Sequence, residues 1–295
     1  MRTVEAGATP ASRLCEDVCA GENAGVNVFD GPAQDLETAP RAPEWLASAH
    51  AVAACAEACL GPALVGVYVH GSAALGGWLA QVSDLDILVV THSAATRGLL
   101  VRFGEEISGL ARSGPASGIE LSVIDRELAR DPRAPWNYLL HVAVPCDPRS
   151  STRVVFDDGA GDPDLLMHIA VTRVAGVAVR GPDPAGLFGD PARHSVLGYL
   201  ASELEWALRE APETYAVLNA CRALAYLEDG LIVSKVAGGV SGIARLPQHQ
   251  ALIARALEGQ RRGLPSRDAG AEARELVTAV VGELRTAADE PTINL

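Results

Sequence analysis

The sequence predicts an α+β protein in which a mixed sheet with flanking helices precedes an α-helical bundle. Within residues 65–90, an alternating apolar strand, a Gly/Ser turn and a continuous apolar run indicate two neighbouring strands. In the second half, leucines and other apolar residues instead recur at helical spacing. We therefore expect residues 1–43 to be a poorly ordered or loosely docked extension, residues 44–160 to form the sheet domain and residues 161–295 to form the helical domain.

Helices flank the strands of the first half. Apolar positions in residues 44–60 fit a helix, and a Gly-Pro pair ends it before the first strand. After the second strand, residues 96–111 have the apolar spacing of an amphipathic helix, and residues 119–124 alternate as a third strand. Residues 125–162 are irregular and rich in proline, so we expect loops with one extended segment near residues 136–144.

The second half is expected to consist of helices. Three are predicted at residues 164–178, 194–209 and 214–226, from the period of their apolar residues. Two more follow within residues 249–288, and their apolar faces are typical of helices that pack in a bundle.

Composition limits the classes of partner. The chain has 295 residues, of which 48% are hydrophobic and 21% charged, which is enough for a sizeable core in one or two domains. Its formal net charge of −13 disfavours nonspecific binding to nucleic acid or to an anionic membrane. The same charge is compatible with a cationic ligand, and equally with simple solubility. We expect neither nucleic acid nor a membrane as a partner.

Cysteine usage and the N-terminal sequence indicate a reducing compartment. The six cysteines form no C-x-x-C motif and have no neighbouring pair of histidines at zinc-finger spacing. Cys15/Cys19 and Cys55/Cys59 are i,i+4 pairs that suit the core side of helices. No apolar segment of signal-peptide length follows Met1. We expect a cytoplasmic monomer with reduced thiols.

The turn and the strand after it carry candidate binding residues. Backbone N–H groups at Gly71 and Ser72, with the Ser72 hydroxyl, can form a phosphate cradle. Asp84 and Asp86 are two residues apart, so both carboxylates lie on one face of a strand. Mg²⁺ between them removes their repulsion, and substrate phosphates commonly complete its coordination. Although a bare D-x-D also fits a turn cap and a solvated strand end, the pair together with the cradle suggests a nucleoside triphosphate.

A third carboxylate is predicted beside this pair. Ile119, Leu121 and Val123 face one side of their strand, so Glu120 faces the other. If this strand neighbours the aspartate strand, Glu120 completes a triad of carboxylates. An exposed residue on an edge strand is the alternative.

These residues resemble a known family. His70-Gly71-Ser72 followed by Ser83-Asp84-Leu85-Asp86 matches the G-S…[ST]-D-x-D signature of nucleotidyltransferases with a polymerase-β-like fold. The residues of this motif are most similar to those of aminoglycoside adenylyltransferases, in particular the streptomycin/spectinomycin 3″-adenylyltransferases. The resemblance implies an N-terminal nucleotidyltransferase domain, with Ser83 beside the nucleotide. It also implies Mg²⁺ held by the two aspartates and Glu120, the latter also acting as the base for the attacking hydroxyl.

A second block of the resemblance lies in residues 217–247. Arg222, a Gly turn, Ser234-Lys235 and a Leu-Pro pair match the order found in the adenylyltransferases. The resemblance, which covers about residues 50–260, implies a helical nucleotide- and substrate-binding domain. Lys235 would reach the triphosphate from it, with Arg222 also on the nucleotide side; a solvated surface lysine is the alternative for Lys235.

Candidates for acceptor binding are acidic or aromatic. A cationic aminoglycoside is attracted to carboxylates, and of four glutamates between residues 203 and 213 we favour Glu210 and Glu213, in the loop before the Arg222 helix. Each fits the solvated end of a helix equally well. Trp136 fits either a stacking contact with the ligand or an anchor in the core.

The function implied by the resemblance is Mg²⁺-dependent transfer of AMP from ATP to a hydroxyl of streptomycin, spectinomycin or both. Pyrophosphate is released, and this modification of the aminoglycoside gives antibiotic resistance. Two alternatives remain open at this point. One is transfer to another hydroxyl, on a small molecule or a protein, and the other is a catalytically silent nucleotide-binding module.

Overall fold

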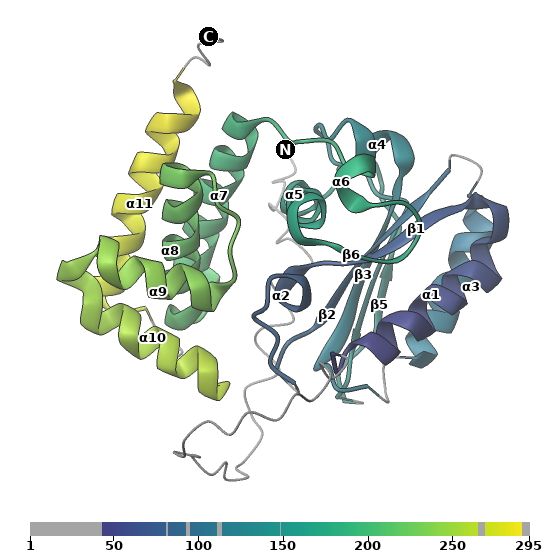
Figure 1. Ribbon diagram of the computed structural model, residues 1–295, viewed down its shortest axis with the longest axis horizontal. Coiled ribbons are helices and arrows are strands. Elements are labelled where there is room, and N and C mark those ends of the chain that lie inside the picture. The colour runs from purple at the N-terminus through teal and green to yellow at the C-terminus, as the bar shows by residue number, and fades with distance from the viewer. Residues whose placement is uncertain are drawn as a thin grey trace, which may run out of the picture.

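The computed structural model describes residues 43–80, 82–92, 95–110, 114–147, 149–264 and 269–290. They form a sheet domain and a helical bundle that lie side by side (Figure 1). This architecture confirms the predicted α+β fold class. The expected N-terminal extension, apart from Pro43, lies outside the described residues, as do Cys15 and Cys19.

The sheet has six described strands in the order β5-β4-β3-β2-β1-β6. Only the β2–β3 pair is parallel and the other pairs are antiparallel, so the sheet is mixed, as predicted. In the parallel register, Asp86 lies opposite Glu120. The strands are β1 (Leu64–Val69), β2 (Leu85–Thr91), β3 (Gly118–Asp125), β4 (Leu140–Pro145), β5 (Arg153–Val155) and β6 (Val177–Arg180).

Each face of the sheet has its own core. Helices α1 (Leu46–Leu60) and α3 (Arg97–Leu110) cover the face that carries Ile119, Leu121 and Val123. Helix α5 covers the other face, with two short helices near it, and the core there includes alternate residues of β1, β2 and β3. Strand alternation places Asp86 and Glu120 on this second face. The other helical elements of the domain are η2 (Gly61–Ala63), α2 (Gly71–Ala74), α4 (Arg126–Arg130), α5 (Leu165–Ala175) and α6 (Pro184–Leu187).

One predicted helix is too long, and a strand was missed. Helix α5 ends at Ala175, not near residue 178, because Gly176 turns the backbone into an extended conformation. Strand β6 then pairs with β1 and completes the sheet. The expected domain boundary between residues 160 and 161 therefore cuts through the sheet domain. We propose a boundary near residue 190, just before α7.

The helical bundle has five described long helices around one core. They are α7 (Arg193–Glu210), α8 (Glu213–Asp229), α9 (Lys235–Arg245), α10 (Gln250–Arg262) and α11 (Ala271–Asp289), with the short turn η4 (Pro247–His249) before α10. Helix α9 lies very close to α8. A Cβ added at Gly238 would meet the Arg222 side chain at 2.7 Å, and one added at Gly242 would meet Cys221 Sγ at 2.5 Å. The glycines thus permit the close approach of the two helices.

One described segment, Leu46–Ala63, is long and apolar enough to cross a membrane by length and composition. It consists of α1 and the turn after it. Ala49, Val52 and Ala56 in this helix are buried in the core against the sheet. Packing against the sheet thus accounts for the apolar residues on the buried side of α1.

Candidate active site

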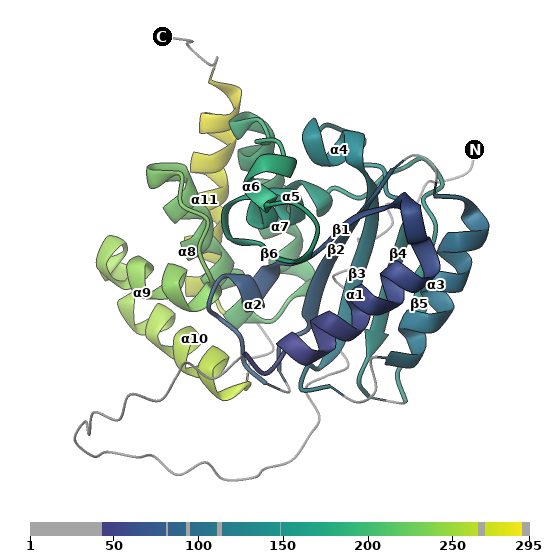
Figure 2. The same cartoon turned by 45° about the vertical axis from the view of Figure 1, so that its right-hand side comes forward.

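A cavity of about 630 Å³ lies between the sheet domain and the helical bundle. Figure 2 shows α2 on the side of the sheet that faces the bundle. Eight of the sequence-predicted residues line this cavity: Gly71, Ser72, Ser83, Asp84, Asp86, Glu120, Arg222 and Lys235. Residues more than 100 positions apart in the sequence thus share one site.

The predicted cradle is a single helical turn that contacts Asp86. Gly71 has φ of +59°, and a Cβ there would overlap the Asp86 carboxylate. The Ser72 backbone N–H donates a hydrogen bond to that carboxylate, which favours its ionised form. Only glycine both adopts this backbone conformation readily and leaves room for the carboxylate. The turn therefore fixes the position of Asp86.

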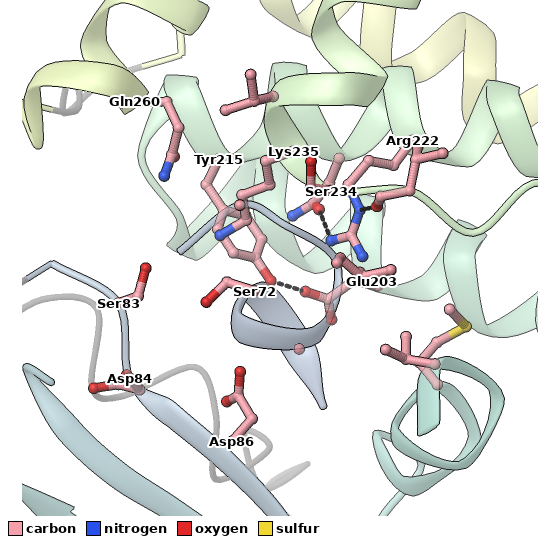
Figure 3. Close-up of a pocket in the computed structure, with 18 of the residues that line it drawn as sticks. Ser72, Ser83, Asp84, Asp86, Glu203, Tyr215, Arg222, Ser234, Lys235 and Gln260 are labelled. Atoms are coloured by element: carbon pink, nitrogen blue, oxygen red, sulfur yellow. Dashed lines mark hydrogen bonds between the residues drawn. The ribbon is translucent and has the colours of Figure 1, made fainter. Parts of the chain in front are cut away.

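Asp84 is held by a different part of the sheet domain. The Ser117 hydroxyl donates a 2.7 Å hydrogen bond to Asp84 Oδ1. Just before it, the Leu79 N–H donates a 3.1 Å hydrogen bond to Ser83 Oγ, which closes the loop that leads into β2. Figure 3 shows the Asp84 and Asp86 carboxylates pointing in different directions.

The electrostatics of the carboxylates favour a cation. Asp86 and Glu120 are partly exposed to the cavity but are enclosed by protein, and this burial is the main cause that raises their pKa values. The pKa of Asp86 rises to about 7, with repulsion from Asp84 adding to burial. The pKa of Glu120 lies well above its usual range, with Asp86 and Asp84 as the next causes. Proximity of buried carboxylates is costly unless a proton or a cation neutralises them.

The donor set fits a divalent cation that a substrate helps to hold. Mg²⁺ is commonly bound by one or two carboxylates, with phosphates and waters in its remaining positions, and Asp84 and Asp86 supply such a pair. Among the described residues, no group of three or more His, Cys, Asp or Glu is arranged to hold a metal ion. The role of Glu120 as a third metal ligand stays a prediction.

Lys235 faces the carboxylates from the helical bundle. It is the first residue of α9, and the Ser234 hydroxyl before it caps the helix by accepting the Ala237 N–H at 3.2 Å. Its Nζ lies 4.4 Å from the centroid of the Tyr215 ring. The Lys235 charge lowers the pKa of both Asp84 and Asp86 against the effect of burial. The charge of Lys235 therefore reaches both carboxylates across the cavity.

Arg222 is placed at the cavity wall by the α8–α9 connection. Its Nε donates to the Val233 carbonyl at 2.8 Å, and its Nη1 donates to Asn219 Oδ1 at 2.9 Å (Figure 3). These bonds tie the guanidinium to the segment that leads into Lys235. Arg222 also lowers the pKa of Asp86, so its charge reaches the carboxylates. It thus holds the backbone before Lys235 and contributes charge to the site.

Two further carboxylates line the cavity, one from each domain. Glu203 of α7 accepts a 2.7 Å hydrogen bond from the Tyr215 hydroxyl. Asp164, just before α5, accepts a 3.0 Å bond from the Tyr199 hydroxyl. Burial raises the pKa of both carboxyls, and that of Asp164 rises to about 8. We call Glu203 and Asp164 the acidic wall.

The favoured acceptor candidates lie elsewhere. Glu210 is exposed and does not line the cavity, because it is seven residues, about 10 Å, farther along α7 than Glu203. Glu213 does not line it either, and its Oε2 accepts the Gly270 N–H at 2.8 Å. Sequence reasoning missed Asp164, which read as the first residue of a helix. Among the carboxylates near this end of the cavity, Glu203 and Asp164 line it, whereas Glu210 and Glu213 do not.

Trp136 is an anchor of the core and not part of the cavity. It has φ of +61° and follows the cis Ala134–Pro135 bond. Its side chain packs against the core cluster that contains Tyr68 and Phe188. It does not line the cavity, so the expected stacking contact is not present in this geometry.

Comparison with family models agrees with the two-domain arrangement. Residues 57–131 match the nucleotidyltransferase domain. Residues 192–286 match the C-terminal domain of aminoglycoside adenylyltransferase. The two matches fall on the sheet domain and on the helical bundle, respectively.

Known proteins resemble the chain over most of its length. Spectinomycin 9-adenylyltransferase of Staphylococcus aureus is 27% identical over 219 residues, which cover 68% of this chain and 79% of that protein. The spectinomycin adenyltransferase of Enterococcus faecialis, solved with ATP and spectinomycin, shares the fold with a TM-score of 0.57. That likeness covers 79% of this chain and 96% of the other, at 19% identity. With its sheet-domain signature, its helical bundle and both domain matches, the chain belongs to the aminoglycoside nucleotidyltransferase family.

Proposed function

We propose that the protein transfers AMP from ATP to a hydroxyl of spectinomycin or a similar aminoglycoside and releases pyrophosphate. The observation that carries the proposal is the set of residues that line one cavity. Asp86 and Glu120 lie opposite each other on one wall, Lys235 faces them, and the acidic wall is close by. The relatives named for spectinomycin support this choice of acceptor.

The nucleotide end of the cavity contains the groups that bind phosphate. The Ser72 hydroxyl and the backbone N–H groups of the Gly71 turn, other than the Ser72 N–H that donates to Asp86, would bind the triphosphate from the sheet side. Lys235 would bind it from the bundle side. Asp84 and Asp86 would hold Mg²⁺, which supplies neutralising charge for the phosphates when bound. Binding from two sides keeps the α-phosphorus in a fixed position for an in-line displacement.

Glu120 is the base in this proposal. The acceptor oxygen forms a bond to the α-phosphorus, the bond to the bridging oxygen breaks, and pyrophosphate leaves with that electron pair. The hydroxyl proton passes to the Glu120 carboxylate. Because burial and neighbouring carboxylates raise its pKa, Glu120 holds a proton more strongly than an exposed glutamate does.

The acidic wall is suited to an ammonium group on the acceptor. Glu203 and Asp164 are both pocket-lining carboxylates, and each already accepts one tyrosine hydroxyl. A cationic group between them would favour their ionised forms, whose desolvation is otherwise costly. This explains why an aminoglycoside, and not a neutral alcohol, is the acceptor class that we propose.

The direct test is turnover with defined acceptors. Purified protein is incubated with ATP and Mg²⁺ and with spectinomycin, streptomycin or an uncharged polyol, while pyrophosphate release and the acceptor mass are recorded. We expect spectinomycin to gain one AMP and the polyol to remain unmodified. The streptomycin arm defines the breadth of acceptor use. If neither aminoglycoside is modified while ATP still binds, the proposed acceptor class is wrong.

A further inference from the structure

Tyr215 contacts two charged residues that line the cavity, Glu203 and Lys235. Its hydroxyl donates a 2.7 Å hydrogen bond to Glu203 Oε1 of the acidic wall. Its ring faces the Lys235 ammonium, with Nζ 4.4 Å from the ring centroid. Figure 3 shows Tyr215 between these two residues. A single side chain therefore contacts a group on the acceptor side and a group on the nucleotide side.

We propose that Tyr215 is a positioning residue with two separable parts. Its hydroxyl orients Glu203 toward the acceptor, and its ring orients Lys235 toward the triphosphate. The proposal rests on the proposed function for the meaning of these two sides. It assigns Tyr215 no direct contact with the reacting atoms.

The hydroxyl fixes one oxygen of a flexible carboxylate. Glutamate has three side-chain torsions, and a hydrogen bond to Oε1 restricts them while Oε2 stays available to a cation. The bond also favours the charged form, since Tyr215 is the first of the groups that lower the pKa of Glu203 against burial. Loss of a hydrogen bond to a charged group typically weakens an interaction about tenfold or more.

The ring acts on a different residue. An ammonium within about 6 Å of an aromatic centroid is attracted to the ring face. The ring is itself held in place by Trp206, whose ring meets it edge-on with centroids 6.0 Å apart. Phenylalanine keeps this ring, whereas leucine removes it. The two parts of Tyr215 can therefore be removed one at a time.

The test compares Tyr215→Phe with Tyr215→Leu in the full-length protein. The KM for ATP and the KM for spectinomycin are measured separately, together with the Kd for ATP without acceptor. For Tyr215→Phe we expect the spectinomycin KM to rise about tenfold and both ATP constants to stay within about twofold. For Tyr215→Leu we expect both ATP constants to rise as well, by about threefold or more. Equal changes in both KM values for Tyr215→Phe, or none, would overturn the proposal.

A matched control separates positioning from folding. Tyr68→Phe removes another tyrosine hydroxyl, one that donates to the Pro182 carbonyl at 3.1 Å in the core outside the cavity. We expect this variant to lose some stability and to keep both KM values. If Tyr68→Phe reproduces the pattern of Tyr215→Phe, the effect is a general loss of packing and the proposal is wrong.

Two further measurements test the link through Glu203. Because the hydroxyl acts through that carboxylate, adding Tyr215→Phe to Glu203→Gln should change the spectinomycin KM by less than about twofold. Carboxyl ¹³C NMR should show a higher pKa for Glu203 in Tyr215→Phe than in the wild type. If the wild type modifies no aminoglycoside, the proposed function fails. The NMR titration then still tests the role of the hydroxyl, and the ATP Kd still tests the role of the ring. An unchanged value in either measurement rejects the corresponding role.

Discussion

Asp86 and Glu120 lie directly opposite each other on the parallel strands β2 and β3, on the face of the sheet that meets the cavity. The register brings two carboxylates together that are 34 residues apart in the sequence. Burial, followed by the charge of Asp86, raises the pKa of Glu120 well above its usual range. Asp86 is therefore suited to hold a cation, and Glu120 is suited to accept a proton.

Glu120→Gln tests the base. The amide has nearly the same shape but cannot take the hydroxyl proton, so turnover should fall by about 10² to 10⁴. The Kd for ATP should change little, because the phosphate-binding groups remain. Pyrophosphate release and calorimetric ATP titration measure the two effects. Wild-type turnover in this variant would exclude Glu120 as the base.

Asp86→Asn tests the cation site. In the wild type, ATP should bind more tightly with Mg²⁺ than with EDTA, since carboxylates and phosphates share the ion. In the variant this difference should largely disappear. Asp131→Asn is the control, because Asp131 lies at the surface in an ion pair with Arg133. A full Mg²⁺ effect in Asp86→Asn would place the ion elsewhere.

Local patterns were enough to predict most of the sheet side of the site. Strand alternation predicted that Glu120 faces away from its apolar neighbours. A Gly-Ser turn followed by D-x-D identified the region around Asp86. The acidic wall could not be predicted in the same way. Asp164 and Glu203 meet only because α7 docks beside the start of α5, which no local pattern encodes. Strand β6 was missed for a similar reason, since four residues became a strand by pairing with distant β1.

Gly71→Ala should separate backbone strain from displacement of Asp86. Gly71 and Gly76 both have positive φ, +59° and +70°, so alanine at either position costs about 1–2 kcal/mol of conformational strain. A Cβ at Gly76 meets nothing within 4 Å, whereas one at Gly71 overlaps the Asp86 carboxylate. We expect both variants to lose stability in denaturant titrations, and only Gly71→Ala to lose most turnover. Similar turnover in the two variants would contradict the role assigned to this turn.

Glu203→Gln should weaken acceptor binding selectively. Glu203 lines the cavity, whereas Glu210 is exposed outside it, and the two residues lie on the same helix. We expect the spectinomycin KM to rise about tenfold or more in Glu203→Gln, because a charge-assisted hydrogen bond is lost, and to stay within about twofold in Glu210→Gln. Steady-state kinetics at two salt concentrations measure the spectinomycin KM of both variants. A larger effect at Glu210 would restore it as the acceptor residue.

The pKa of Asp164 predicts how stability changes with pH. Burial, followed by the charges of Asp162 and Glu203, raises this pKa from 3.8 to about 8 in the folded protein. Between these values the folded state binds a proton that the unfolded state has lost. The free energy of unfolding therefore falls as pH rises, by up to about 1.4 kcal/mol per pH unit for one group. Below pH 4 both states are protonated, and above pH 8 both are ionised, so the slope vanishes there.

Asp164→Asn removes this proton while its side-chain oxygen can still accept the Tyr199 hydroxyl. Asp86 and Glu120 also have raised pKa values, but they are present in both proteins and contribute to both slopes. Urea denaturation without nucleotide, between pH 5 and pH 7.5, should therefore show a shallower decline for Asp164→Asn than for the wild type. The variant should become relatively more stable as pH rises, because no buried carboxyl has to ionise at this position. Parallel declines in the two proteins would mean that Asp164 is already ionised in the folded state near pH 5, with its charge balanced by the groups around it.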